Sequence, residues 1–203
     1  MTRLCHFNNI FQTSAVLAIL SSAESAQSIR HYLSEDATKT LICTFVLSRL
    51  DYCNALLSDS QNLDRLQKVQ NNAARLIYRS SKFNHVTPLL YTLHWLPIEK
   101  KRIDFKLASL CFKSPNGSAP TYLSDLLHLY TPSRQLRSSA DTRVFRIPSF
   151  RTKSSGQRSF SYQAPTTWNK LPASIRYASS VSSFKSSLKT FLFSKTFSSV
   201  PLP

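Results

Sequence analysis

The chain has 203 residues with 26 Lys or Arg against 10 Asp or Glu, giving a net charge of +16 and a pI of about 10.1. This length allows one sizeable core or a domain with an appended subdomain, and an apolar share of 42% argues against wholesale disorder. Two glycines are too few for a Gly-rich phosphate loop, which excludes a Rossmann or P-loop nucleotide site.

The positive charge is concentrated toward the C-terminus. Residues 129–203 contain 12 basic residues and one acid, a net +11, whereas residues 1–128 contain 14 and nine, a net +5. A field of this sign attracts polyanions, so nucleic acid is the first predicted partner. The alternatives are a basic surface that faces an acidic domain of a larger protein and an anionic membrane surface. The membrane surface is disfavoured because no long helix pairs a wide apolar face with a continuous basic one.

The N-terminal segment and the cysteines bear on the compartment. Residues 1–28 form a predicted leader, or a short helix, whose continuous apolar run over residues 15–20 is too short for a secretory signal or a membrane span. The cysteines, at positions 5, 43, 53 and 111, have neither zinc-finger spacing nor the density of a disulfide scaffold. We therefore predict reduced thiols in a cytoplasmic or nuclear protein without a bound metal or cofactor.

Helices are predicted over most of residues 34–129. Ser34 is a predicted N-cap for a helix that reaches residue 57, with a break near Asp51. Further helices are predicted over residues 62–79, 87–94, 97–113 and 120–129, with a turn at 115–117.

The helix predicted over residues 62–79 has an apolar face bordered by a basic edge. Leu66, Val69, Ala73 and Leu76 follow a 3-4-3 spacing, which places them on one side of the helix. Basic and polar residues repeat one position earlier, about 100° away. The pattern predicts a helix that buries one face and exposes cations beside it.

The character of the sequence changes beyond residue 130. Serine makes up 18 of the last 75 residues, and two strands are predicted at 142–148 and 157–163, with Gly156 in a positive-φ turn between them. A final helix is predicted at 180–195. The predicted fold class is mainly α: a helical bundle over residues 29–130, followed by a basic Ser-rich extension over residues 131–203 that holds the β-hairpin and the last helix.

Catalytic and metal-binding constellations are not found. A polymerase needs paired carboxylates to hold two metal ions, and the sequence contains no Asp-Asp pair. Asp51 is interpreted as a salt-bridge or helix-breaking residue, and Asp104 as an offset to the neighbouring cations. His85 and His94 are interpreted as packed or capping histidines because no third ligand is near them. We therefore expect no enzymatic activity.

Phosphate contact is the better-supported chemistry. Basic residues border two predicted helices and crowd residues 134–158, where aromatic residues lie among them. Phe145, Phe160 and Tyr162 are predicted to be the buried face of the hairpin. The candidate nucleic-acid-binding residues are Arg65, Lys68, Arg75, Arg79, Arg102, Lys106, Lys113, Arg134, Arg137, Arg143, Arg146, Arg151, Lys153 and Arg158.

Four phrases occur in a characteristic order along the chain. They are SRLDYCNALL (residues 48–57), LQKVQNNAARL (66–76), HWLPI (94–98) and APTTWNKLP (164–172), with HVTPLL (85–90) and GSAPTYL (117–123) between them. Together, over residues 29–195, they resemble the region downstream of the polymerase domain in non-LTR (LINE-like, jockey-type) retrotransposon reverse transcriptases. The resemblance implies a thumb-like region and C-terminal extension that grip template RNA, primer or target DNA, without the catalytic palm.

Three functional hypotheses follow. The first is a non-catalytic remnant that binds the RNA or DNA backbone. The second is an interaction or structural domain that packs on the polymerase palm of the parent element, and the third is a translated element fragment with no selected function. None of the three involves a membrane or a small-molecule substrate.

Overall fold

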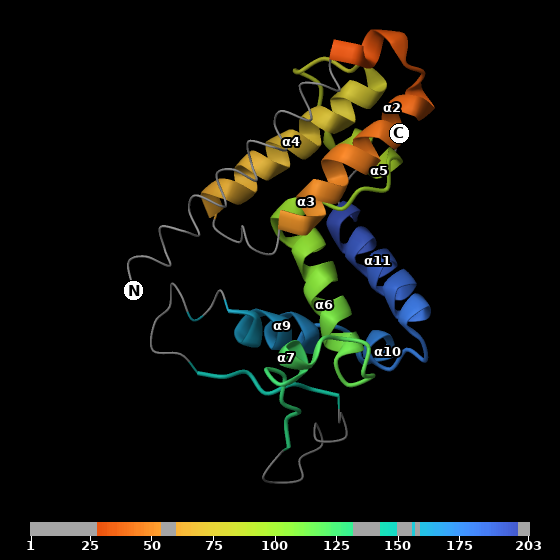
Figure 1. The fold of residues 1–203 in the computed structure, drawn as a ribbon. Coiled ribbons are helices and arrows are strands. Elements are labelled where there is room, and N and C mark those ends of the chain that lie inside the picture. The colour runs from red at the N-terminus through yellow and green to blue at the C-terminus, as the bar shows by residue number, and fades with distance from the viewer. Residues whose placement is uncertain (1–27, 54–59, 132–142, 150–155, 157–158, 199–203) are drawn as a thin grey trace, which may run out of the picture. The chain divides into compact units, whose positions relative to one another are not determined.

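The computed structural model describes residues 28–53, 60–131, 143–149, 156 and 159–198. The fold is mainly α, as the sequence predicts (Figure 1). The chain divides into two compact units: residues 1–103 with 196–203, and residues 104–195. This division falls near the start of α6 (Ile103–Lys113), whereas the predicted domain boundary at residue 130 rests on composition alone and stays a prediction.

The first unit begins with consecutive helical segments. After the turn η1 (Arg30–Tyr32) come α2 (Glu35–Ile42), the π-helical η2 (Cys43–Leu47) and α3 (Ser48–Cys53). Ser34 is the N-cap of α2, as predicted, because its hydroxyl accepts from the Ala37 N–H at 3.2 Å. The predicted helix is confirmed as far as α3, which continues through Asp51 without the predicted break, and residues 54–59 lie outside the described part of the chain.

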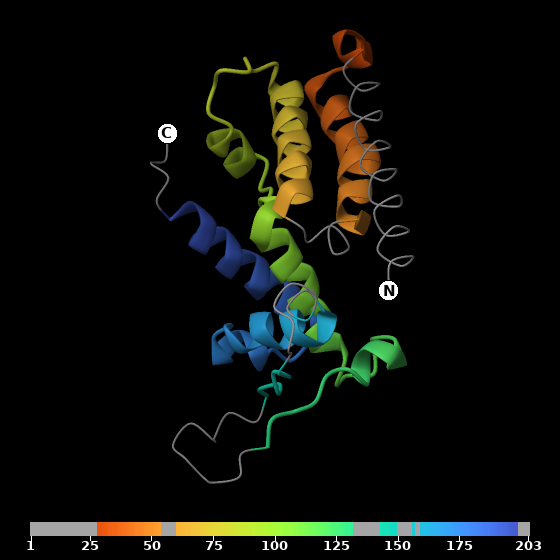
Figure 2. The same ribbon diagram turned by 90° about the vertical axis from the view of Figure 1, so that its left-hand side faces the viewer.

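Helix α4 (Ser60–Tyr78) is central to this unit. It contacts α2, α5 (Thr87–Thr92) and η3 (Ile98–Arg102), and it lies beside the α2–α3 stretch (Figure 2). Leu66, Val69 and Ala73 are buried as predicted, and Leu76 is half-buried. From the facing stretch, Ile42, Val46 and Leu50 complete an apolar core at i, i+4, i+8 spacing.

Two glutamines of α4 hold the extended segment that leads into η3. Gln70 is fully buried and its Nε2 donates to the Leu96 carbonyl at 2.9 Å. Gln67 accepts from the Ile98 N–H at 2.8 Å, and its own Nε2 donates to Gln70 at 3.0 Å. The two side chains therefore supply the hydrogen-bond partners that a neighbouring strand would otherwise give to this extended segment.

The C-terminal end of α4 is closed by a buried arginine. The Arg30 side chain donates to the carbonyls of Leu76 and Ile77, both at 2.8 Å, and to that of Leu33 at 2.8 Å. Arg30 is only 6% exposed. The Leu76 and Ile77 carbonyls belong to the last turn of α4, where intrahelical donors run out and the helix dipole is negative. The Arg30 guanidinium supplies donors for these carbonyls and places a positive charge at the negative end of the helix dipole.

The second unit is built around an aromatic core. It contains α6 from Asp104 onward, α7 (Thr121–Ser124), α9 (Phe160–Asn169), α10 (Ala173–Arg176) and most of α11 (Val181–Phe197). Phe112 and Phe184 stack with ring centroids 4.3 Å apart, and Trp168 lies 5.7 Å from Phe184. Cys111 is buried beside Phe112, and burial raises the pKa of its thiol to about 12.

The predicted β-hairpin is wrong. The segment around Phe145 is extended, but it pairs with Leu129 in an isolated antiparallel bridge, through Tyr130 N–H to Val144 O and Arg146 N–H to His128 O, both at 2.8 Å. Residues from Phe160 onward form α9, because Ala164 and Trp168 bury one helical face in the core. Phe160 and Tyr162 are accordingly half-buried on a helix.

Two predicted turns and one predicted helix have different outcomes. Gly156 has helical backbone rather than the predicted positive φ. Gly117, at φ +65°, ends the predicted turn at 115–117. The helix predicted over 120–129 is only the single turn α7, after which the chain leaves helical geometry toward its bridge with Phe145. Within the part of the chain that the structure describes, no helix combines the length and apolar character that crossing a bilayer requires.

Replacing Arg30 with Met should lower the free energy of unfolding by about 2–4 kcal/mol, because it strands carbonyls at the end of α4. Urea unfolding followed by circular dichroism measures this. Arg65→Met, at an exposed position of α4, is the matched control and should change the midpoint little. Equal midpoints for the two variants would show that Arg30 does not stabilise the helix end.

Gln70→Leu keeps the side-chain volume but removes the donor to Leu96, so we expect a loss of about 1–3 kcal/mol in unfolding free energy. Asn72→Leu, two residues further along on the exposed side of α4, is the control. Hydrogen exchange should also speed up at Ile98, whose N–H is held by the neighbouring Gln67. An unchanged exchange rate in Gln70→Leu would argue that the two glutamines act independently.

Candidate nucleic-acid interface

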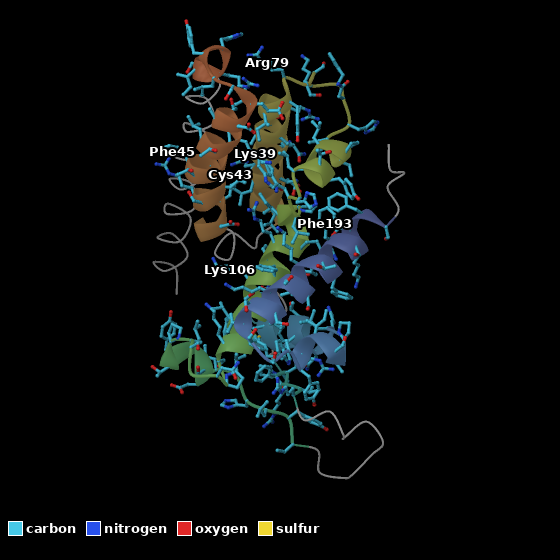
Figure 3. The ribbon with its side chains drawn as sticks, turned by 90° about the vertical axis from the view of Figure 1, so that its right-hand side faces the viewer. Lys39, Cys43, Phe45, Arg79, Lys106 and Phe193 are labelled. Atoms are coloured by element: carbon cyan, nitrogen blue, oxygen red, sulfur yellow. The ribbon has the colours of Figure 1, made fainter. Side chains whose placement is uncertain are left out.

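The outer edge of α4 presents some of its predicted cations to solvent. Arg65 and Lys68 are exposed one turn apart, and Asn72 continues the same edge. Arg79, just beyond the helix, is also exposed, and Figure 3 labels it near the end of α4. The span from Arg65 to Arg79 is about 21 Å at 1.5 Å per residue. These three cations lie within the first unit.

Two other predicted cations of the first unit are tied into the fold. Arg102 forms a bidentate ion pair with Asp51, with Nε–Oδ1 at 2.6 Å and Nη2–Oδ2 at 3.1 Å, and its side chain is 19% exposed. Arg75 is half-buried and donates to the Asn84 carbonyl at 3.1 Å, which ties α4 to the loop before α5. The predicted salt-bridge role of Asp51 is confirmed, and its partner lies 51 residues away.

Arg79 has an unusual backbone conformation. Its φ is +50°, in the left-handed region, and the following Ser80 N–H bonds to the Arg75 carbonyl at 3.0 Å. This six-to-one hydrogen bond is the Schellman motif, in which glycine is the usual residue at the left-handed position. An arginine there costs conformational energy. His94, at φ +53°, ends α5 in the same way, with Trp95 N–H bonded to Leu90 O at 2.9 Å.

Helix α6 contributes two half-exposed lysines to the second unit. Lys106 and Lys113 are two turns apart on α6, and Lys106 is labelled on it in Figure 3. Asp104, the acid predicted to offset neighbouring cations, accepts from the Thr167 hydroxyl of α9 at 3.4 Å. Asp104 therefore links α6 to α9, which carries most of the phrase at residues 164–172.

The basic extension places two arginines on either side of a buried aromatic residue. Arg143 and Arg146 are exposed, whereas Phe145 is buried, as predicted. The Arg143 guanidinium lies 4.9 Å from the Tyr177 ring centroid and donates to the Arg176 carbonyl at 3.0 Å. The remaining candidates lie outside the described residues: Arg134, Arg137, Arg151, Lys153 and Arg158.

The cations of α11 are absent from the sequence-based candidates. Lys185 and Lys189 are exposed one turn apart, each about 100° around the helix from the buried residue before it, Phe184 or Leu188. Every exposed residue of α11 is Lys, Ser or Thr, and the helix has no acid. The i, i+4 spacing of the two lysines between apolar positions is the signal that identifies this face.

A shallow cavity of about 270 Å³ lies in the second unit, with the exposed Arg143 in its lining. Its lining residues are Phe112, Pro115, Asn116, Leu129, Arg143, Phe145 and Trp168. Its three aromatic side chains are only 2–4% exposed, so most of the accessible lining comes from the exposed Pro115, Asn116, Leu129 and Arg143, the last of which supplies a cation. In the described ranges, no group of three or more His, Cys, Asp or Glu side chains is arranged as metal ligands would be. The cavity therefore combines an apolar wall with a cation.

No family model, curated protein or solved structure matches this chain. The described residues form an exposed cationic edge in the first unit, and in the second unit a Lys/Ser/Thr helix face and a cavity that Arg143 helps to line.

Arg79→Gly should separate stability from binding. Glycine relieves the left-handed strain, so we expect the unfolding free energy to rise by about 1 kcal/mol. The same variant should bind single-stranded RNA more weakly, because a phosphate contact is lost. Urea unfolding and fluorescence anisotropy measure the two effects. The control Asn72→Gly, inside α4, should instead destabilise by about 1 kcal/mol, and a destabilised Arg79→Gly would contradict the Schellman assignment.

Proposed function

We propose that this chain is a non-catalytic remnant of a non-LTR retrotransposon reverse transcriptase that binds the backbone of RNA or DNA, in the cytoplasm or the nucleus. The observation that carries the proposal is the charge segregation of the second unit. Its residues 104–195 include 14 Lys or Arg and three Asp, a net +11. One long face of this unit, on α11, is made only of Lys, Ser and Thr.

Such a face suits phosphate contact for two physical reasons. Lys185 and Lys189 are about 6 Å apart along the helix, so both can approach one strand of closely spaced phosphates. The serine hydroxyls between them are short donors that bond to phosphate oxygens without carrying sequence information. Binding of this kind releases condensed counterions, and its affinity falls with salt. The expected activity is therefore sequence-independent binding.

The proposal includes no chemistry on the bound strand. The sequence has no Asp-Asp pair to hold the metal ions of phosphoryl transfer. Of its four cysteines, Cys111 is buried, and its raised thiol pKa makes it a poor nucleophile. The chain would act by holding nucleic acid, alone or beside the polymerase portion of the parent element.

A second candidate function is protein interaction, and a different surface favours it. Tyr122, Leu126, Leu129 and Tyr130 are between 46% and 66% exposed on α7 and the segment after it. Large apolar side chains close together on a surface are typical of interaction sites. A polymerase palm is the partner that the family resemblance implies. Tyr122→Ser with Leu126→Ser should abolish such an association, which would persist at high salt in the unaltered chain.

The salt dependence of RNA binding tests the proposed function. In anisotropy titrations with single-stranded RNA, log K should fall linearly with log[salt], with a slope of about −0.7 for each phosphate contacted. Lys185→Ala with Lys189→Ala should reduce the magnitude of this slope by about 1.4, because two contacts are lost. A chain that shows no binding at low salt would refute the proposal.

The matched control removes the same charge from the other unit. Lys39→Ala with Lys82→Ala changes two exposed lysines, on α2 and in the loop after α4, that are not among the proposed contacts. The slope should stay near that of the unaltered protein. Equal slope changes for both double variants would mean that net charge alone, rather than the α11 face, determines binding.

A further inference from the structure

The cavity of the second unit has a wall that is fixed by side-chain hydrogen bonds. The Asn169 side chain bonds to both backbone groups of Phe145: its Oδ1 accepts from the Phe145 N–H at 3.0 Å, and its Nδ2 donates to the Phe145 carbonyl at 2.8 Å. The Arg143 carbonyl accepts from Trp168 Nε1 at 2.6 Å and from Arg176 Nη1 at 3.2 Å. The extended segment from Arg143 to Phe145 is thus held against α9. The cavity wall is pre-organised rather than a loop that forms around a ligand.

The opposite part of the lining comes from the segment after α7. Leu129 lies directly across the antiparallel bridge from Phe145, so the two side chains are on the same face of this pair. Leu129 is 53% exposed, whereas Phe145 is 4% exposed. Asn116 adds a side-chain amide, whose Nδ2 donates to Phe112 O at 3.0 Å. The cavity therefore has an exposed leucine above buried aromatic rings and a side-chain amide with an acceptor oxygen.

We propose that this cavity takes one unpaired nucleobase of a bound single strand, while Arg143 contacts the adjoining phosphate. The inference rests on the proposed function and adds a requirement for an unpaired base. A volume of about 270 Å³ is just below the range of drug-sized sites, so the occupant is small. Bases of single strands bind among aromatic side chains and arginine guanidinium planes, and hydrogen-bond through their edges.

Charge and position favour a nucleotide over an uncharged aromatic ligand. The guanidinium of Arg143, which lines the cavity, is held against the Tyr177 ring, and the exposed Arg146 follows three residues later. A base with its attached phosphates matches an apolar wall with cations beside it. Bases within a duplex are stacked and paired, so they cannot enter without being unstacked. The cavity should therefore distinguish single strands from duplexes.

The test compares a single-stranded DNA with a strand of equal length in which the bases are replaced by abasic sites. The full-length protein should bind the abasic strand about tenfold more weakly at the same salt, since base contacts are lost and phosphate contacts remain. Leu129→Trp fills the cavity without changing charge, and it should bind both strands alike. Ile147→Trp, at a similarly exposed position outside the lining, should keep the tenfold difference.

The possible outcomes separate this inference from the proposed function. Equal binding of the two strands by the unaltered protein overturns the pocket assignment while leaving backbone binding intact. A Leu129→Trp variant that keeps the tenfold difference overturns it too, because the base then binds elsewhere. Failure of both strands to bind at low salt overturns both proposals. If Leu129→Trp fails to show the unaltered circular dichroism spectrum, Leu129→Phe takes its place with the same expected result.

Discussion

Both units depend on hydrogen bonds from helical side chains to the backbone of extended segments. Buried amide and carbonyl groups need partners, and a chain that is mainly helical with long extended connections offers few from its own backbone. Gln70 supplies one for Leu96 in the first unit, and Asn169 supplies two for Phe145 in the second. Without these donors and acceptors, the extended segments would have to be solvated, and the cores that they cover would open.

This constraint gives a physical role to the sequence phrases at residues 48–57, 66–76, 94–98 and 164–172. The glutamines of residues 66–76 hold the phrase at 94–98, Asp51 of the first phrase pairs with Arg102, and Trp168 and Asn169 of the last phrase hold the segment from Arg143 to Phe145. A longer, shorter or apolar side chain at these positions would leave a backbone group or a charge without its partner. Most residues of the phrases therefore build the scaffold, and the exposed cations lie mainly between and beside them.

The sequence predicts helices well where an amphipathic period is clear, as in α4 and α11, and where a cap such as Ser34 is local. It fails at residues 160–163, where an aromatic–polar alternation is typical of a strand but tertiary burial of Trp168 decides for a helix. It also cannot distinguish buried from exposed cations. Arg30 and Arg65 are the same residue type, yet Arg65 is exposed and Arg30 is buried. The carbonyls that accept from Arg30 lie 46 and 47 residues further along the chain.

The distinction between these cations changes what the net charge can do. Arg30 and Arg176 are buried against carbonyls and Arg102 is neutralised by Asp51, so these charges add little to the external field. The exposed lysines of α11 have no acid on their own helix, and the like charges of the second unit repel one another in the compact state. A polyanion that binds only the folded unit would relieve this repulsion and stabilise it by mass action. Under the proposed function, binding and folding of the second unit would be thermodynamically linked, and a bound polyanion would add to the stability that the aromatic core provides.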